Sequence, residues 1–349
     1  MRPKTNGILE SSLYVSDVAR SARFYEKIFG FRVISDFGGR GCAMVSSDRM
    51  TLLIDYSSLL YRAFHSLPDT IPMRGVYGFF GMLARLLADR RPARLAIAVD
   101  DDWRPAFRVK ALPTYKAHRL SDEEDPIAAD EALGRRLLRA LGFTVAGAAG
   151  FEGEDVIATL AARASGAVDI VSGDRDLFAL VRDPDVRVLY PLTGVSKLLV
   201  VDEAEIRRRY GIPGRAYGDF ALLRGDPSDG LPGVPGIGEK TAAALVAEHG
   251  SLAAVLASRA LAPAVARRIE AARDYLAAAR RVVLPVADVP LPHLSLALPS
   301  TAANPKLARR LAAEHRLDGA VARVEAAVAA LRSPAGATGA RTDGGGSRG

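Results

Sequence analysis

Acidic side chains follow three short apolar segments of the chain. Asp55 ends the run TLLID, Asp101 lies in the acidic triplet after RLAIAV, and Asp174 follows VDIVSG. In an open α/β sheet, ligands bind at the edge formed by the carboxyl ends of the parallel strands. Because the three runs have the length of buried strands, we expect these carboxylates to gather at one edge of a sheet.

Further acids extend this set. Glu152 and Asp155 are spaced i, i+3 at the start of a predicted helix, with Glu154 between them, and Asp174 and Asp176 are spaced i, i+2. So many carboxylates in one place repel each other, and a hard divalent cation relieves that repulsion most simply. Oxygen ligands suit Mg²⁺ or Mn²⁺, and two such ions can activate a water and stabilise the leaving oxygen of a phosphodiester.

Each of these acids also has an interpretation without a metal. A lone Asp after a strand is usually a helix cap or a loop residue, and the triplet 100–102 is compatible with a solvated turn. Glu154 and Asp155 alone fit the favourable negative charge of a first helical turn. The recurrence at three strand ends and one helix start favours the metal site.

A glycine-rich turn precedes another predicted helix. In GLPGVPGIGEKT, residues 230–241, Gly236 and Gly238 predict a tight turn, and Lys240 and Thr241 open the helix that follows. Free amide groups at a helix N-terminus bind anions, and here the anion would be a DNA phosphate that is contacted without reading the base sequence. The alternative is an interhelix turn without a ligand.

A basic segment, FRVKALPTYKAHR, covers residues 107–119. Its cations are Arg108, Lys110, Lys116 and Arg119. Tyr115 lies among them, and cations next to an aromatic ring fit phosphate contact and base stacking. Lys116 and Arg119 are spaced i, i+3 on a possible helix. The alternative is that these cations form a solvated basic surface without a ligand.

The elements that must position these residues alternate between strand and helix. Strand patterns at 51–55, 94–99 and 168–171 alternate with helical patterns, which predicts a parallel sheet of the doubly wound kind. From about residue 206 the predicted strands stop and the chain is helical. The last stretch, 333–349, has the composition of a disordered tail.

Composition places few limits on function. The net charge of +7 and the pI near 9.6 favour a polyanionic partner, although an Ala- and Arg-rich chain raises its pI without any binding role. One cysteine, Cys42, excludes an internal disulfide and indicates a reducing compartment. The N-terminus lacks the apolar core of a signal peptide and no run is long enough to span a membrane, so we expect a cytoplasmic, nucleoid-associated protein.

Together these segments resemble the bacterial 5′-to-3′ exonuclease family, which comprises the nuclease domain of DNA polymerase I, phage homologues and distant flap endonucleases. The matching text includes LLIDYSSLLYRAFHSLP, GFEGEDVIATLA, VSGDRDLFALV and LRGDPSDGLPGVPGIGEKTAAALV. DWRPAFR and PTYKAHR are most similar to the stand-alone actinobacterial form. The resemblance implies a Mg²⁺-dependent, structure-specific 5′-3′ exonuclease or 5′ flap endonuclease that acts in DNA replication and repair.

The resemblance also implies a fold and a division into domains. A PIN-like (resolvase-like) parallel sheet flanked by helices would cover residues 50–205, with a helical arch at about 105–125. An all-α, helix-three-turn-helix DNA-binding domain would cover 206–300, and C-terminal helices would cover 301–332. The chain would act as a monomer.

Site residues follow from the same resemblance. The ligands of two Mg²⁺ or Mn²⁺ ions would be Asp55, Asp101, Glu152, Glu154, Asp155, Asp174, Asp176, Asp226 and Asp229. Lys116 and Arg119 would engage the scissile phosphate. The DNA contacts would come from Arg62, Arg108, Tyr115, Gly236, Gly238, Lys240 and Thr241, with a K⁺ ion at the glycine-rich turn.

The chain departs from the family pattern at three positions. Tyr56 and Gly230 stand where the family usually has Gly and Asn, and Glu154 replaces a usual Asp. None of these changes removes a carboxylate, so we expect activity to survive. The Tyr56 change is the most consequential, because it lies beside the first acid.

Residues 1–49 resemble the opening β-α-β of the glyoxalase and bleomycin-resistance superfamily. Glu10 falls where that superfamily often places a metal ligand, but only about half a module is present, and we expect no metal there. A gene fusion, or a start at Met50, explains the segment as well as a working domain does.

A DNA-binding protein without catalysis and a glyoxalase-type enzyme are the alternative functions.

Overall fold

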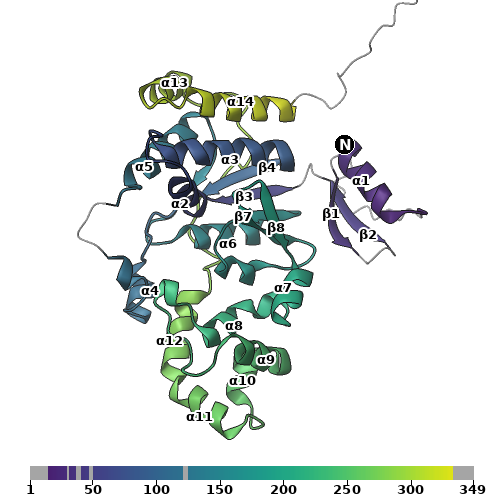
Figure 1. Cartoon of the computed structure of the whole chain (residues 1–349), viewed down its shortest axis with the longest axis vertical. Helices are drawn as coiled ribbons and strands as arrows, with labels where there is room; N and C mark the ends of the chain where they lie inside the picture. Colours follow the sequence, from purple (N-terminus) through teal and green to yellow (C-terminus); the bar gives the residue numbers. More distant parts are fainter. Residues whose placement is uncertain (1–14, 30, 37–40, 47–49, 121–124, 333–349) are drawn as a thin grey trace, which may run out of the picture.

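The structure is a computed structural model, which describes residues 15–29, 31–36, 41–46, 50–120 and 125–332 (Figure 1). Its centre is a six-stranded sheet with the order β5-β4-β3-β6-β7-β8. The strands are β3 (Thr51–Asp55), β4 (Arg94–Ala98), β5 (Val145–Ala146), β6 (Val168–Val171), β7 (Val186–Thr193) and β8 (Lys197–Val201).

The sheet is mixed rather than wholly parallel. All neighbouring strands from β5 to β7 are parallel, and β8 is antiparallel to β7. A connection of three residues, 194–196, joins β7 to β8, and parallel neighbours would need a crossover of a dozen residues or more. The prediction of a parallel sheet is therefore confirmed for the strands that carry the acids and is wrong for the edge strand.

Both faces of the sheet are covered, which explains why its strands are apolar without alternation. Along β3, Leu52 and Ile54 belong to one buried cluster and Leu53 belongs to the other. The first cluster is closed by α2 (Tyr56–Ser66), α3 (Arg74–Arg90), α5 (Ala128–Ala140), α13 (Pro305–Glu314) and α14 (Asp318–Arg332). In Figure 1, α14 lies along α3 at the top of the molecule.

The second cluster is shared by the sheet and the helical part of the chain. It contains α6 (Gly153–Arg163) and continues into helices that follow the last strand. These helices are α7 (Glu203–Tyr210), α8 (Tyr217–Arg224), α9 (Glu239–His249), α10 (Leu252–Ala257), α11 (Pro263–Ala271) and α12 (Arg273–Val283). Between Val201 and Arg332 the structure contains no further strand, as the sequence predicts.

The predicted helical arch is short in the described residues. It contains α4 (Ala106–Ala111) and a single 3-10 turn, Ala117–Arg119. Lys116 has a φ of 49°, so it does not share a helix with Arg119. Pro113 disfavours helical geometry at the residue before it, and α4 ends at that point. Residues 121–124 lie outside the described residues.

Near the N-terminus, α1 (Val18–Phe29) is followed by an antiparallel pair, β1 (Phe31–Asp36) and β2 (Cys42–Ser46). Asp17 accepts a hydrogen bond from the amide of Arg20 at 2.8 Å, which is the predicted helix cap. The strand predicted at 8–15 and the turn after β1 lie almost entirely outside the described residues. Arg187 on β7 donates to the carbonyl of Val33 at 2.8 Å, which links this pair to the main sheet.

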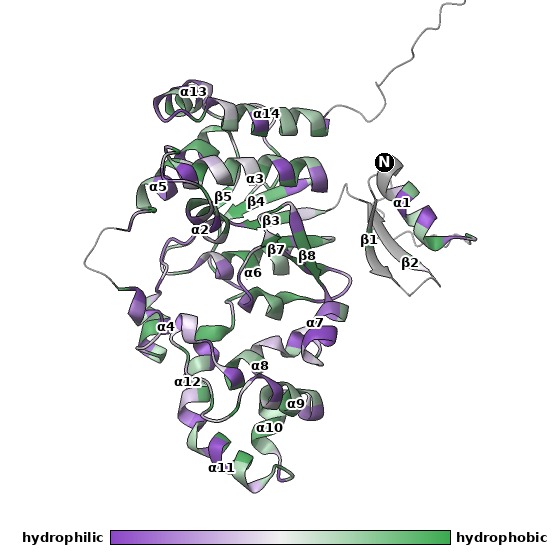
Figure 2. Ribbon diagram, viewed as in Figure 1, coloured by the Kyte–Doolittle hydropathy of each residue, from purple (hydrophilic) through white to green (hydrophobic). Residues whose placement is uncertain are grey.

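Figure 2 shows the apolar residues concentrated on the inner strands and on the helix faces that cover them. None of the helices in the described residues is both long enough and apolar enough to cross a membrane.

Candidate active site

A cleft of about 1220 Å³ opens at the carboxyl edge of β3 and β6. Eight carboxylates line it: Asp55, Asp100, Glu152, Glu154, Asp174, Asp176, Asp226 and Asp229. Basic side chains line it as well: Arg62, Lys116, Arg119, Arg175 and Arg224. The sequence predicts seven of these acids, and the fold brings them together from four elements.

The strand-end acids are held by local hydrogen bonds. Asp55 caps α2 by accepting from the amide of Ser58 at 3.1 Å, and it accepts from the Ser172 hydroxyl at 2.6 Å. Asp174 accepts from the amide of Asp176 at 2.9 Å, and its own amide donates to Ser172 Oγ at 2.9 Å. One serine after β6 therefore fixes two strand-end carboxylates relative to each other.

After β4, Asp100 lines the cleft, and Asp101 does not. Asp101 accepts from Arg135 on α5 at 2.9 Å, while Asp100 accepts from the amide of Gly153 at the start of α6 at 2.5 Å. The acid of this triplet that lines the cleft is therefore Asp100, one residue before the predicted Asp101. Strand pairing places Asp55 opposite Ala98, so Asp100 lies nearer to Asp55 along the edge.

The start of α6 supplies two acids to the cleft and one to the interior. Glu152 and Asp155 form a reciprocal capping box, and Asp155 also accepts from the amide of Val286 at 2.7 Å. One oxygen from each of Glu152, Glu154 and Asp155 lies within 4.8 Å of the others. Asp155 is fully buried and does not line the cleft, so it also positions the start of α6, and its place among the ligands stays a prediction.

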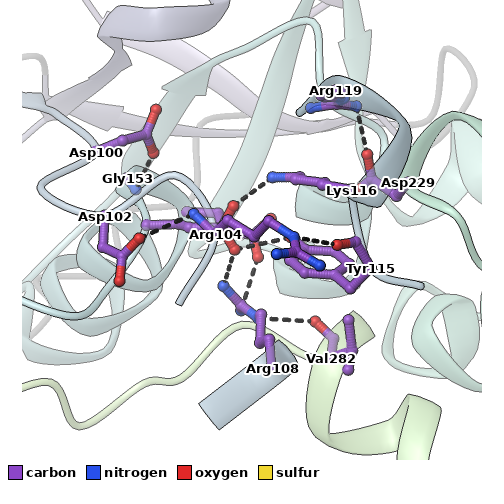
Figure 3. Close-up of polar contacts among 12 residues, drawn as sticks. Asp100, Asp102, Arg104, Arg108, Tyr115, Lys116, Arg119, Gly153, Asp229 and Val282 are labelled. Carbon is purple, nitrogen blue, oxygen red and sulfur yellow. Dashed lines mark hydrogen bonds and ion pairs between the residues drawn. The ribbon is translucent and has the colours of Figure 1, made fainter. Parts of the chain in front are cut away.

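Arg108 explains how three carboxylates are tolerated there. Its guanidinium is fully buried, pairs with Asp155 at 2.7 and 3.0 Å and with Glu154 at 2.7 Å, and contacts Glu152 (Figure 3). It also donates to the carbonyl of Val282 on α12 at 3.0 Å. The prediction of Arg108 as a DNA contact is wrong, because no part of it reaches solvent.

Tyr115 is likewise not available to DNA. Its side chain is 2% exposed, and its hydroxyl donates to Glu152 at 2.8 Å. The predicted stacking role therefore does not fit Tyr115. The sequence pattern gave the right segment, but it does not show which of its side chains point inward.

Lys116 and Arg119 line the same cleft as the strand-end acids. Lys116 pairs with Glu152, and its amide donates to the carbonyl of Asp229 at 2.9 Å. Arg119 pairs with Asp229 at 2.6 Å and donates to the carbonyl of Ser228 at 2.8 Å (Figure 3). The segment that carries both cations therefore contacts cleft acids from two separate parts of the chain, Glu152 and Asp229.

Burial and mutual repulsion raise the pKa of the cleft carboxyls. Burial, with the neighbouring charges of Asp100 and Asp174, raises the pKa of Asp55 to about 7. Burial is also the main cause of the raised pKa of Glu154, Asp174 and Asp176, and neighbouring carboxylates add to it. A cleft that holds so much unneutralised negative charge is suited to bind cations.

The glycine-rich turn lies between α8 and α9, beyond the cleft. Gly236 has a φ of 76°, Gly238 is the N-cap of α9, and both are exposed together with Lys240. Thr241 is half-buried. Arg268 on α11 donates to the carbonyl of Gly236 at 3.0 Å. The sequence did not predict a role for this residue.

Two of the departures from the family pattern, Tyr56 and Gly230, fit their surroundings in the structure. Tyr56 is fully buried, its ring packs against Phe79, and its hydroxyl donates to the carbonyl of Glu131 on α5 at 3.2 Å. It therefore points away from the cleft. Gly230 has a φ of 74°, and an added Cβ would lie 2.2 Å from the carbonyl oxygen of Thr114, so glycine suits this position.

The comparisons with known proteins agree with this geometry. Residues 50–211 match the family "5'-3' exonuclease, N-terminal resolvase-like domain", and residues 212–306 match "5'-3' exonuclease, C-terminal SAM fold". The fold is therefore that of a resolvase-like nuclease domain followed by a helical SAM-like domain. Residues 8–47 match "Bleomycin resistance protein-like N-terminal", in line with the second resemblance.

Relatives extend the match to most of the chain. A 5'-3' exonuclease of Streptomyces coelicolor is 45% identical over 295 residues, which cover 78% of this chain and 98% of the relative. A 5'-3' exonuclease of Mycobacterium tuberculosis is 40% identical over 80% of this chain and 98% of the relative. The chain belongs to the 5′-3′ exonuclease family and is a nuclease.

Two further comparisons are with a longer protein and with a more distant one. DNA polymerase I of Mycobacterium tuberculosis is 47% identical over 211 residues, which are 58% of this chain and 23% of the polymerase. A bacteriophage T5 flap endonuclease, solved with DNA and metal ions, has a TM-score of 0.56 at 16% identity and covers 81% of this chain and 99% of its own. That likeness supports the fold.

Proposed function

We propose that this nuclease is a divalent-metal-dependent, structure-specific enzyme that cleaves DNA at the junction between a 5′ single strand and a duplex. The observation that carries this proposal is the cleft itself, where eight carboxylates and several basic side chains line one opening. Acids alone would bind metal, and cations alone would bind phosphate. Both together suit the hydrolysis of a phosphodiester.

The cleft residues fit hard cations, because every candidate ligand is a carboxylate oxygen. Two Mg²⁺ or Mn²⁺ ions would be held by two sets of acids. The first set is Asp55, Asp100, Glu152 and Glu154, and the second is Asp174, Asp176, Asp226 and Asp229. Bound there, the ions would activate a water and stabilise the charge of the leaving oxygen.

The chain's own cations would orient the substrate. Lys116 and Arg119 border the carboxylates, so a phosphate drawn to them would lie against the metal-binding acids. Arg62 on α2 would contact the same strand from the other side of the cleft. These three side chains would neutralise the phosphate and fix its orientation for attack.

The glycine-rich turn would hold the duplex. Its exposed backbone at Gly236 and Gly238 and the side chains of Lys240 and Thr241 suit contact with phosphates, with a K⁺ ion among the carbonyl groups of the turn. Recognition would therefore depend on the shape and charge of DNA and would weaken steeply with salt. We assign catalysis to residues 50–205 and duplex binding to 206–300, in a monomer that acts in replication and repair.

A cleavage assay on a 5′-flap substrate in Mg²⁺ tests this proposal. The wild-type chain should cut near the junction and leave a 5′-phosphate, and Asp174→Ala should lose cleavage by at least two orders of magnitude. Binding of the flap substrate in the absence of Mg²⁺ should persist in the variant. Equal cleavage by both proteins would refute the assignment.

Two alternative functions predict other results. A DNA-binding protein without catalysis would bind the flap tightly and show no Mg²⁺-stimulated cleavage by the wild type. A glyoxalase-type function would depend on the N-terminal segment, whereas the nuclease should keep its cleavage activity when residues 2–49 are deleted.

A further inference from the structure

Large apolar side chains are exposed at few places in the described residues after 50. They are Tyr61, Trp103, Leu120 and Leu192. Tyr61 lines the cleft, and Trp103 and Leu120 lie on the segment 100–120 that borders it. Leu192 lies on β7, two residues after Tyr190, which also lines the cleft. Exposed apolar surface that gathers at one opening is a sign of binding.

Trp103 is an exposed aromatic side chain four residues before the basic segment 107–119. Tyr115 is 2% exposed, and Phe107 is half-buried against Phe151 with ring centroids 5.8 Å apart. Trp103, in contrast, is 43% exposed. Among the aromatic residues of 100–120, Trp103 is therefore the one whose ring is open to the base stacking that the sequence suggested for Tyr115.

The loop that carries Trp103 is held firmly on both sides of it (Figure 3). The Asp102 amide donates to the carbonyl of Phe151 at 3.2 Å, and the Asp102 carboxylate accepts from the Arg104 amide at 3.0 Å. The Arg104 guanidinium donates to the carbonyls of Tyr115 at 2.7 Å and Pro113 at 2.9 Å. A ring on such a loop loses little entropy on binding, because its backbone is already ordered.

The surroundings suit a single strand. From Trp103 to Leu120 the sequence contains no acid, and apart from the buried Arg108 its cations are Arg104, Lys110, Lys116 and Arg119. Asp100, three residues before Trp103, lines the cleft, so the ring's backbone lies within about 10 Å of it. At about 3.4 Å per stacked nucleotide, this is a reach of about three nucleotides.

We propose that Trp103 is a stacking platform for an unpaired nucleobase of the 5′ strand beside the cleft. The proposal rests on the proposed function and adds a residue that contacts base instead of phosphate. Stacking on an indole is tolerant of sequence, because every base has a flat face. The ring would thus favour substrates with an unpaired 5′ strand over blunt duplexes.

The chain contains a single tryptophan, so its fluorescence reports on this residue alone. We would titrate the full chain, in Ca²⁺ in place of Mg²⁺ and with strand integrity checked on a gel, with a duplex that carries a ten-thymidine 5′ flap. A matched duplex would carry ten abasic sites in the flap, which keep the phosphates and remove the bases. The thymidine flap should quench Trp103 emission, and the abasic flap should leave it nearly unchanged.

Binding by variants gives a second readout. Trp103→Leu should weaken binding of the thymidine flap by about 5- to 150-fold and leave binding of the abasic flap unchanged, which also shows that the variant is folded. The affinity of Trp103→Phe for the thymidine flap should lie between those of the wild type and Trp103→Leu. Leu192→Ala should bind this flap as tightly as the wild type. Equal quenching by both flaps, or unchanged binding by Trp103→Leu, would overturn the proposal. A wild type that binds neither flap nor duplex would instead contradict the proposed function.

Discussion

At the scale of single residues, the acidic triplet after β4 gives the sharpest distinction between adjacent side chains. Asp100 lies in the cleft and raises the pKa of Asp55, while Asp101 is paired with Arg135 outside it. We expect Asp100→Asn to reduce flap cleavage by at least 100-fold and Asp101→Asn to reduce it less than 5-fold. Cleavage rates of the two variants, measured side by side in Mg²⁺, check this. The reverse order would place Asp101 in the site.

The buried guanidinium of Arg108 gives a second prediction at this scale. Arg108→Met leaves Glu152, Glu154 and Asp155 without their shared cation, and the loss of one partner from a buried ion pair costs about 3–5 kcal/mol. Urea unfolding measures this loss. The unfolding free energy of Arg108→Lys should lie between those of the wild type and Arg108→Met, because lysine keeps the charge and loses the forked geometry.

Arg85 provides the control for Arg108, because its pair with Asp89 on α3 is exposed on both sides. Arg85→Met should change the unfolding free energy by no more than about 0.5 kcal/mol. Unchanged stability of Arg108→Met would show that the buried network does not hold the site together.

The acids after strands and at one helix start predicted five of the eight cleft carboxylates, and the family resemblance added Asp226 and Asp229. Two things were not available from the sequence. Spacing does not show which member of a run such as 100–102 faces the cleft, because that depends on strand register. Nor does a basic, aromatic segment show that Arg108 and Tyr115 turn inward, since both depend on contacts with α6 and α12, far along the chain.

At the scale of elements, the packing of α2 against α5 depends on a close fit at Gly134. A Cβ added there would lie 2.0 Å from the hydroxyl oxygen of Tyr56. Although Gly→Ala inside a helix is normally stabilising, we expect Gly134→Ala to cost about 1–3 kcal/mol by overpacking. Tyr56→Phe in the same chain should recover part of this loss, because it removes the atom that clashes.

Gly81 on α3 offers a matched helical site, because an added Cβ there meets nothing within 4 Å. Gly81→Ala should stabilise the protein by up to about 1 kcal/mol. Thermal or urea unfolding of the three variants compares them directly. A stabilising Gly134→Ala would contradict the packing described for Tyr56.

Periodicity predicted the elements of the sheet well and its connections less well. The pattern RGVYGFFGMLARLLADR coincides with α3, and TLLID coincides with β3. The β7–β8 hairpin was not predicted, although the connection 194–196 contains Gly194, which has a φ of 50° and is a turn signal. The arch was expected to be helical through Lys116, where Pro113 and the left-handed backbone end the helix.

At the scale of the whole molecule, ionisation of the buried cleft carboxyls should destabilise the folded protein when no metal is bound. The pKa of Asp55 is about 7 when folded, against its ordinary 3.8, so folding favours the protonated form. The stability from this group is present at low pH and is lost as pH rises through 7. We expect the melting temperature in EDTA to fall between pH 6 and pH 8.

Metal should reverse that trend. Added Mg²⁺ binds the ionised carboxylates, so it should raise the melting temperature more at pH 8 than at pH 6. Asp55→Asn should flatten the pH dependence seen in EDTA. A melting temperature in EDTA that rises over this range would contradict the account.

The central claim is that carboxylates scattered from Asp55 to Asp229 gather in one cleft in order to hold divalent metal. Anomalous diffraction from a crystal soaked in Mn²⁺ measures this most directly. We predict two strong peaks inside the cleft, one near Asp55, Asp100 and Glu154 and one near Asp174, Asp176 and Asp229. Fully occupied Mn²⁺ peaks elsewhere on the molecule, with none in the cleft, would contradict the claim.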